Sequence, residues 1–328
     1  MNSHKDPNSP ILLKVEGLKK YFPLKRGFFQ RIAAHIKAVD GVDFAIEQGK
    51  SVGLVGESGC GKSTVARVLL RLLEPDGGTI VYKGRDITRF SQKEMKPLRK
   101  EMQIVFQDPF SSLNPRMTIG QSIEEGLRIL GLSKNGRQRR RDELLEMVGL
   151  SALTADRYPH EFSGGQRQRV GVARALSVES SLIICDEPIS ALDVSIQAQL
   201  INLLKDLQDQ LGLSYLFISH DLNVVSYLSD TVAVMYLGHV VEYAETETLF
   251  ETPRHPYTQA LLSAAPSVEM DQRSNIQPLK GDVPSPMDPP PGCKFQGRCP
   301  LVEPRCRQGE IDFSKVGENH LVRCWKVT

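Results

Sequence analysis

A glycine-rich segment, GESGCGKST at residues 56–64, constrains the fold of this 328-residue chain more than any other feature. An apolar run at 52–55 precedes it, and residues 64–73 are apolar at helical spacing. A strand, a glycine-rich loop and a helix in this order form a P-loop, whose backbone N–H groups and helix dipole bind phosphate. Lys62 would reach the β- and γ-phosphates, and the Ser63 hydroxyl would bind magnesium. The expected nucleotide-binding residues of the loop are Gly56, Glu57, Ser58, Gly59, Cys60, Gly61, Lys62, Ser63 and Thr64.

The composition is that of an ordinary globular chain with a sizeable core, since 40% of the residues are hydrophobic and 24% are charged. A net charge of +2 gives no reason to expect a nucleic-acid partner. The N-terminal residues lack the apolar core of a signal peptide, and no run of about 18 apolar residues could span a membrane. We therefore expect a cytosolic chain that does not cross a membrane by itself.

Strand and helix patterns alternate through the first 250 residues. Apolar alternation at 11–20 and 37–46 predicts an antiparallel strand pair. A basic run at 137–141 is interpreted as a solvated helix face. Further strands are expected at 102–106, 181–185 and 215–219, helices over most of 118–178 and at 197–211, and a strand pair at 231–243. This alternation favours a mostly parallel sheet with right-handed crossovers.

Two adjacent acids follow the buried strand expected at 181–185. Asp186 would hold magnesium directly or through water. Glu187 is the natural candidate to orient and deprotonate the attacking water. Two solvated acids at the end of a strand are the alternative reading, which a nearby P-loop disfavours.

A second glycine-rich helix start is formed by Ser163, Gly164, Gly165 and Gln166. It predicts another anion-binding helix N-terminus in the same chain, although a Gly-Gly pair can also mark a plain helix start. One nucleotide does not need two such sites from one molecule. We therefore expect each chain to supply half of a composite site across a dimer.

The order of these motifs resembles that of the ATP-binding-cassette (ABC) ATPases over about residues 11–250. The resemblance implies an α/β fold, a RecA-like P-loop NTPase core with an antiparallel β subdomain and an inserted helical subdomain at about 108–178. This nucleotide-binding domain would cover residues 1–255. The implied cofactors are ATP and Mg²⁺, with magnesium held through Ser63, Gln107 and Asp186.

The resemblance also implies roles for single residues. Tyr21 resembles the aromatic residue that stacks on adenine, with Phe22 as the fallback. Gln107 resembles the loop glutamine that contacts magnesium and the attacking water while sensing the membrane subunit. Asp193 resembles the loop aspartate that links the two sites, and His220 the switch histidine at the γ-phosphate. The signature residues at 163–166 would close on the partner chain's ATP. The implied catalytic residues are Glu187, His220 and Gln107.

The last part of the chain resembles the C-terminal extension of the dipeptide and oligopeptide importer ATPases. The resemblance rests on RHPYTQALL at 254–262, GCKF at 292–295 and RCP at 298–300. Seven prolines between Pro278 and Pro300 indicate an irregular, Cys-rich extension, which we place at 256–328. The implied function is ATP hydrolysis at a composite dimer interface that drives uptake of dipeptides and short oligopeptides.

Four of the six cysteines, Cys293, Cys299, Cys306 and Cys324, lie in this extension with the spacing C-x5-C-x6-C-x17-C. In a reducing cytosol such clustering favours metal or cluster ligation over disulfides. Four thiolates suit either tetrahedral zinc or an iron–sulfur cluster, and the wide gaps favour the cluster, with unligated thiols as a third possibility. The resemblance implies a [4Fe–4S] cluster, with zinc as the alternative.

The implied partners are two transmembrane permeases, an external peptide-binding protein reached through them, and a homologous second ATPase subunit in a heterodimer, with no nucleic acid. The chain would then lie peripherally on the cytoplasmic face of the membrane. Nickel, glutathione or antimicrobial peptide are alternative substrates. An ABC ATPase acting on DNA is disfavoured because no sustained heptad pattern exists. A P-loop kinase or GTPase would leave the signature and His220 unexplained.

Overall fold

The computed structural model describes residues 10–26, 31–108, 112–264, 281 and 283–327. The chain divides into two compact units. The first unit comprises Met1–Glu47, Ser51–Phe90 and Ile218–Thr328, and the second comprises Gln48–Lys50 and Ser91–Phe217. The boundary expected near residue 255 stays a prediction, and residues 265–280 of the expected extension lie outside the described residues.

An antiparallel sheet of four strands lies in the first unit, in the order β2-β1-β4-β5. Its strands are β1 (Ile11–Arg26), β2 (Arg31–Glu47), β4 (Gly77–Tyr82) and β5 (Arg85–Asp86). Strand β1 pairs with β2 along nearly its full length, from Ile11 opposite Glu47 to Arg26 opposite Arg31. The side chains of Leu13 and Val15, which lie on one face of β1, are buried. The predicted antiparallel pair is therefore confirmed, and both strands run longer than expected.

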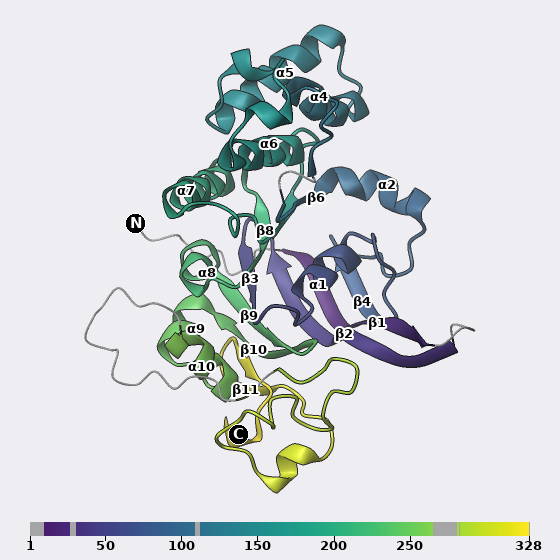
Figure 1. Ribbon diagram of the computed structural model, residues 1–328, viewed down its shortest axis with the longest axis vertical. Coiled ribbons are helices and arrows are strands. Elements are labelled where there is room, and N and C mark those ends of the chain that lie inside the picture. The colour runs from purple at the N-terminus through teal and green to yellow at the C-terminus, as the bar shows by residue number, and fades with distance from the viewer. Residues whose placement is uncertain (1–9, 27–30, 109–111, 265–280, 282, 328) are drawn as a thin grey trace. The chain divides into compact units, whose positions relative to one another are not determined.

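The second set of strands in the first unit runs in the order β11-β12-β10-β9-β3. These are β3 (Ser51–Val55), β9 (Thr231–Tyr236), β10 (His239–Glu245), β11 (Ser314–Gly317) and β12 (His320–Val322). Strand β3 is buried throughout and pairs parallel with β9, while β12 pairs antiparallel with β10. The tail therefore extends a sheet, which the expectation of an irregular extension missed. The helices of this unit are α1 (Lys62–Leu69), α8 (Leu222–Leu228), α9 (Thr246–Glu251) and α10 (Pro256–Ala264) (Figure 1).

The second unit combines a short parallel sheet with most of the helices. Strand β6 (Met102–Val105) pairs parallel with β7 (Leu182–Asp186). Strand β8 (Ser214–Ser219), of which residues 214–217 belong to this unit, is next to β7. The helices are α2 (Gln92–Glu101), α4 (Ile119–Ile129), α5 (Lys134–Met147), α6 (Gly164–Leu176) and α7 (Val194–Leu211) (Figure 1). The predicted strands and the helix-rich stretch at 118–178 are confirmed. Within the described ranges, no helix combines the length and apolar character needed to cross a membrane.

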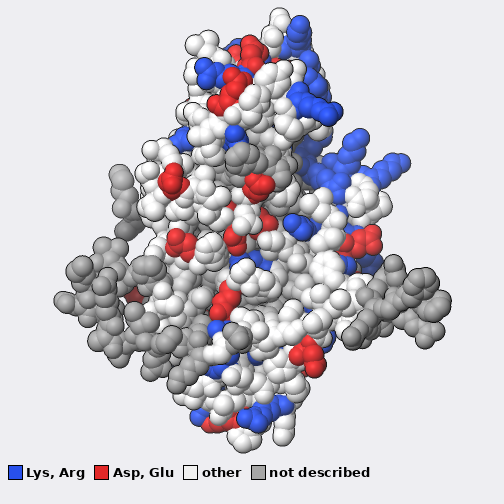
Figure 2. Space-filling model, in the orientation of Figure 1, with Lys and Arg blue, Asp and Glu red and all other residues white. Residues whose placement is uncertain are grey.

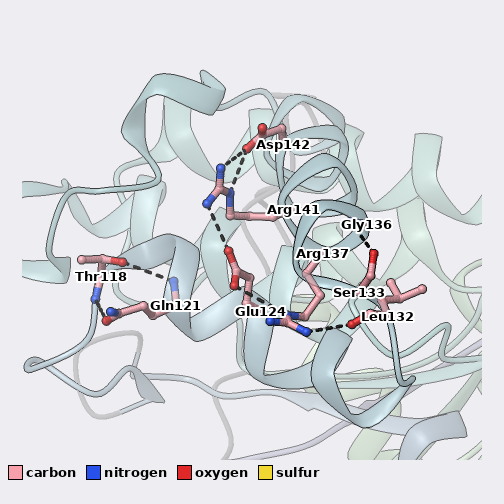
Figure 3. Close-up of polar contacts among 9 residues, drawn as sticks. All are labelled: Thr118, Gln121, Glu124, Leu132, Ser133, Gly136, Arg137, Arg141 and Asp142. Carbon is pink, nitrogen blue, oxygen red and sulfur yellow. Dashed lines mark hydrogen bonds and ion pairs between the residues drawn. The ribbon is translucent and has the colours of Figure 1, made fainter.

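The basic run at 137–141 lies on α5 and is only partly a solvated face. Arg137 and Arg141 both pair with Glu124 of α4, at 3.9 and 3.1 Å (Figure 3). The side chain of Arg139, in contrast, is 85% exposed. Figure 2 shows many Lys and Arg side chains gathered on the side of the second unit that carries α2, with others scattered over the rest of this face. Two arginines of the run therefore fix α5 against α4, and the prediction of a wholly solvated face is wrong for them.

Candidate functional site

The P-loop connects β3 to α1 in the first unit, and its shape depends on glycine. Gly61 is the N-cap of α1 with φ 110°, and a Cβ at this position would lie 2.0 Å from the carbonyl oxygen of Ala38. Only glycine adopts such a φ at low cost, and only glycine fits against that backbone. The Lys62 ammonium donates to the carbonyl oxygens of Gly56 at 2.8 Å and Glu57 at 3.2 Å. The lysine is therefore held over the start of the loop.

The loop cysteine is part of the packing and not a reactive group. Cys60 is only 4% exposed, and burial raises the pKa of its thiol. Its carbonyl oxygen accepts a hydrogen bond from Gly238 N–H at 3.0 Å, which ties the loop to the turn between β9 and β10. A buried, protonated thiol behaves as a small hydrophobic group, so Cys60 stabilises the loop by packing beneath it.

The acidic pair and the loop glutamine meet in the second unit. Asp186 is the last residue of β7 and is 4% exposed. Glu187 turns the chain sharply with φ 48°, an uncommon conformation for a residue with a side chain. Its carboxylate oxygen Oε2 accepts a hydrogen bond from Gln107 Nε2 at 3.3 Å. Two of the three implied catalytic residues are thus brought together, across 80 positions in the sequence.

The signature segment begins helix α6 with a capping box. Ser163 Oγ accepts from Gln166 N–H at 3.3 Å, and Gln166 Oε1 accepts from Ser163 N–H at 3.0 Å. Gly165 lies against α7, because a Cβ there would be 2.3 Å from Ile196 Cγ2. Ser163 and Gln166 remain exposed. The segment therefore presents a preformed helix N-terminus at the surface of this unit.

Asp193 and His220 both occupy exposed positions at the starts of helices. Asp193 is the N-cap of α7 but makes no side-chain capping hydrogen bond. His220 follows the end of β8, between Ser219, whose hydroxyl accepts from Asp221 N–H at 2.9 Å, and Asp221, which caps α8. His220 belongs to the first unit and Asp193 to the second.

Tyr21 is held by acidic residues of its own unit. Its hydroxyl donates to Asp40, and its backbone N–H donates to Asp76 Oδ2 at 2.6 Å. Burial and the Asp40 hydrogen bond raise the pKa of Tyr21. The ring lines a cavity of about 390 Å³ with Lys37, His239 and residues of the tail, and no P-loop residue lines it. The stacking role of Tyr21 therefore stays a prediction.

The four tail cysteines line one small cavity of about 10 Å³. Cys293 N–H donates to the carbonyl oxygen of Cys306 at 2.8 Å, which joins two of the segments that carry them. Burial raises the pKa of Cys293 to about 11, and the three other cysteines add to this shift. No group of three or more His, Cys, Asp or Glu side chains in the described part of the chain is arranged to hold a metal ion. The donor atoms suit a cluster, whereas the cavity holds about one water molecule.

The expected site residues divide between the two units. The P-loop, Tyr21, His220 and the four cysteines lie in the first unit, and Gln107, Asp186, Glu187, the signature and Asp193 lie in the second. The structure also shows two P-loop contacts that sequence reasoning missed. Tyr257 and Arg298 bind Glu57 through its backbone N–H and its carboxylate. No local pattern could have found Arg298, because 241 positions separate it from Glu57.

Comparison with known proteins covers both the core and the tail. A family model for ABC transporters matches residues 39–190, and one for the C-terminal region of oligopeptide/dipeptide transporters matches residues 241–306. The oligopeptide transport ATP-binding protein AppF of Bacillus subtilis is 49% identical, and the alignment covers 97% of this chain and 98% of AppF. The dipeptide transport ATP-binding protein DppF of Haemophilus influenzae is 46% identical, with both chains covered completely.

Among solved structures, the dimeric post-hydrolysis state of the ATP-binding cassette MJ0796, bound to ADP and Pi, has a TM-score of 0.63. It is 28% identical in sequence, and the match covers 71% of this chain and 98% of the cassette. The similar fold and the full-length sequence similarity indicate the same class of protein as the P-loop and the acidic pair do, an ABC ATPase. The chain therefore belongs to the ABC transporter family, among the ATP-binding proteins with an oligopeptide/dipeptide transporter C-terminal region.

Proposed function

We propose that this chain hydrolyses ATP to drive the uptake of dipeptides and short oligopeptides through partner membrane permeases. ABC transporter ATP-binding subunits are ATPases, and the core motifs alone do not distinguish their cargo. The observation that carries the peptide assignment is the likeness of the tail, since residues 241–306 match the oligopeptide/dipeptide transporter C-terminal region. AppF and DppF, which align over nearly the whole chain, are named for oligopeptide and dipeptide transport.

In this proposal the P-loop binds the triphosphate, with Lys62 at the β- and γ-phosphates. Ser63, Gln107 and Asp186 would hold Mg²⁺, which neutralises charge on the phosphates. Glu187 is the general base for the attacking water, and the hydrogen bond from Gln107 at 3.3 Å supports this role because it orients the carboxylate. His220 would bind the γ-phosphate, and Tyr21 would stack on adenine.

The complete site would require two chains. The exposed, capped N-terminus of α6 is suited to bind an anion from outside its own chain. We infer that residues 163–166 of one chain close on the ATP of another, with Asp193 linking the two sites. MJ0796, a cassette of similar fold, is dimeric in its structure with ADP and Pi, which supports a working form of two chains. The second chain would be a homologous ATPase subunit, so the working form would be a heterodimer.

We propose that the chain acts at the cytoplasmic face of the membrane, where it binds two permeases that receive peptides from an external peptide-binding protein. We expect this chain to co-purify with such permeases and not with DNA ends. A strain that lacks it should fail to grow on a dipeptide as the sole source of a required amino acid. Wild-type chain should restore growth, and Lys62→Ala should not. Unchanged growth on dipeptides, with loss of uptake of nickel, glutathione or antimicrobial peptide instead, would contradict the peptide assignment.

We further propose that Cys293, Cys299, Cys306 and Cys324 bind a [4Fe–4S] cluster that orders the tail, with zinc as the alternative. Their convergence on one cavity supports this proposal. Because that cavity is only about 10 Å³, the segments that carry the cysteines would have to open to admit the group. In the bound state the cysteines would be thiolates. For Cys293, Cys299 and Cys324 this requires a cation, because burial raises the pKa of these three thiols.

The cysteine proposal predicts about four iron and four sulfide per chain after anaerobic purification, and absorbance near 400 nm. Cys299→Ser should lose both signals, whereas Cys185→Ser should keep them because Cys185 lies in β7 of the second unit and does not line the tail cavity. One zinc per chain would select the alternative. A protein purified anaerobically with neither metal would contradict the proposal.

A further inference from the structure

An ion pair joins Arg298 of the tail to Glu57 of the P-loop. Arg298 Nη1 donates to Glu57 Oε2 at 2.6 Å, and Arg298 Nη2 donates to Glu57 Oε1 at 3.0 Å. The Arg298 side chain is 6% exposed and that of Glu57 is 25% exposed. Two parallel charge-assisted hydrogen bonds fix both the position and the orientation of a carboxylate. This bidentate geometry distinguishes the pair from ordinary surface ion pairs, most of which contribute little to stability.

An aromatic cluster holds Arg298 in place. Phe295 is 1% exposed and lies 5.3 Å from the ring of Tyr236 and 5.4 Å from the ring of Tyr257. The guanidinium of Arg298 lies 5.9 Å from the centre of the Tyr236 ring. The Tyr257 hydroxyl in turn accepts a hydrogen bond from Glu57 N–H at 3.0 Å. Glu57 is therefore fixed at its backbone and at its side chain by two segments that follow residue 250.

Glu57 occupies a position where a negative charge has a cost. It is the second residue of the P-loop, and its carbonyl oxygen accepts a hydrogen bond from Lys62, the lysine expected to bind phosphate. An unpaired carboxylate here would repel the anionic triphosphate and compete for Lys62. Arg298, in the tail, supplies the compensating positive charge. Its two hydrogen bonds keep the Glu57 carboxylate directed toward the Arg298 guanidinium.

We propose that Arg298 is a positioning residue for ATP binding, which acts through Glu57 by neutralising its charge and fixing the start of the P-loop. The proposal rests on the proposed role of the P-loop in binding ATP. It makes the tail part of the nucleotide site in its own chain. Arg298 directly precedes Cys299, so the same segment carries a cysteine of the tail cavity and the P-loop contact.

A double-mutant cycle in the full-length chain tests the proposal. Fluorescence titration with an ATP analogue should show that Arg298→Ala weakens binding about tenfold, because the Glu57 charge becomes unpaired. Glu57→Gln should weaken binding less than Arg298→Ala does, since it removes the repelling charge together with the ion pair. The double variant should bind within about threefold of wild type, so the second substitution rescues the first. Arg298→Lys should lie between Arg298→Ala and wild type because it keeps the charge and loses the paired geometry.

Controls separate this role from general folding of the tail. Arg305→Ala also removes a tail arginine, one that pairs with Glu303 at 3.1 Å and is 53% exposed, and it should leave ATP affinity within about twofold. An Arg298→Ala variant with unchanged affinity would overturn the proposal, as would a double variant as weak as Arg298→Ala. Lys62→Ala tests the premise, because retention of ATP affinity in that variant would refute the P-loop assignment itself.

Discussion

Replacing Glu187 by Gln should lower ATP turnover by at least about 100-fold while ATP remains bound, since a general base contributes roughly 10²–10⁴ to the rate. Glutamine has the same shape and can still hydrogen bond to Gln107, which lies 3.3 Å from the carboxylate. It cannot take a proton from water. With hydrolysis blocked, two chains should stay closed around ATP. Phosphate release measures turnover, and size-exclusion chromatography with ATP detects the trapped dimer.

Glu179 provides a matched control for this experiment. Like Glu187 it belongs to the second unit and has a positive φ, 57° against 48°, but it is exposed and precedes β7. Glu179→Gln makes the same chemical change at a similar backbone conformation, so turnover should stay within about twofold of wild type. Normal turnover in Glu187→Gln would refute the general-base assignment. Equal losses in both variants would show that the effect does not depend on the position of the carboxylate beside Gln107.

The elements around the nucleotide motifs could be predicted because their signals are local. The apolar run before the P-loop becomes β3, which is buried at every position, and the run before Asp186 becomes β7, also buried throughout. Continuous apolar runs of this length are typical of strands in a parallel sheet. The glycine spacing then determines where the loop and α1 begin. Sequence and structure agree here because each signal lies within a few residues of its consequence.

Helix α2 shows where local signals conflict. Ser91 and Glu94 form a capping box, with Ser91 N–H donating to Glu94 Oε2 at 2.8 Å, and this S-x-x-E pattern is visible in the sequence. Pro97 lies inside the helix, however, and proline argues against a helix interior. Only Met95 of this helix is buried, so its apolar periodicity is weak. The sequence therefore did not predict helix α2, although the capping box marks where it begins.

The contacts of the tail could not be predicted because they join distant positions. Strand β12 is only three residues long and is recognisable only through its pairing with β10 and β11. The ion pair between Arg298 and Glu57 likewise leaves no periodic pattern in either segment. The cysteine spacing suggested a shared site. The four cysteines do line one cavity, but its small volume could not be read from the spacing, and in the described part of the chain they are not arranged to hold a metal ion. Tertiary packing decides such features.

Replacing Gly61 by Ala should abolish measurable ATP binding, with a loss of at least about 100-fold in affinity. The new Cβ would lie 2.0 Å from the carbonyl oxygen of Ala38, and φ is 110°, so both the backbone conformation and the packing oppose alanine. A strained φ costs about 1–3 kcal/mol, and the clash with backbone atoms adds to it. The loop must therefore move, and with it the start of α1 and Lys62. Titration with a fluorescent ATP analogue measures the affinity, and urea unfolding measures the stability.

Gly59 isolates the contribution of the clash. It lies in the same loop with φ 78°, but a Cβ there would have no heavy atom within 4 Å. Gly59→Ala therefore carries only the strain of the positive φ, about 1 kcal/mol, and should keep ATP affinity within about tenfold of wild type. Equal losses in the two variants would show that the glycine conformation, and not the close approach to Ala38, determines the loop. Full ATP affinity in Gly61→Ala would show that the P-loop binds phosphate in a different shape, since alanine cannot occupy the one described here.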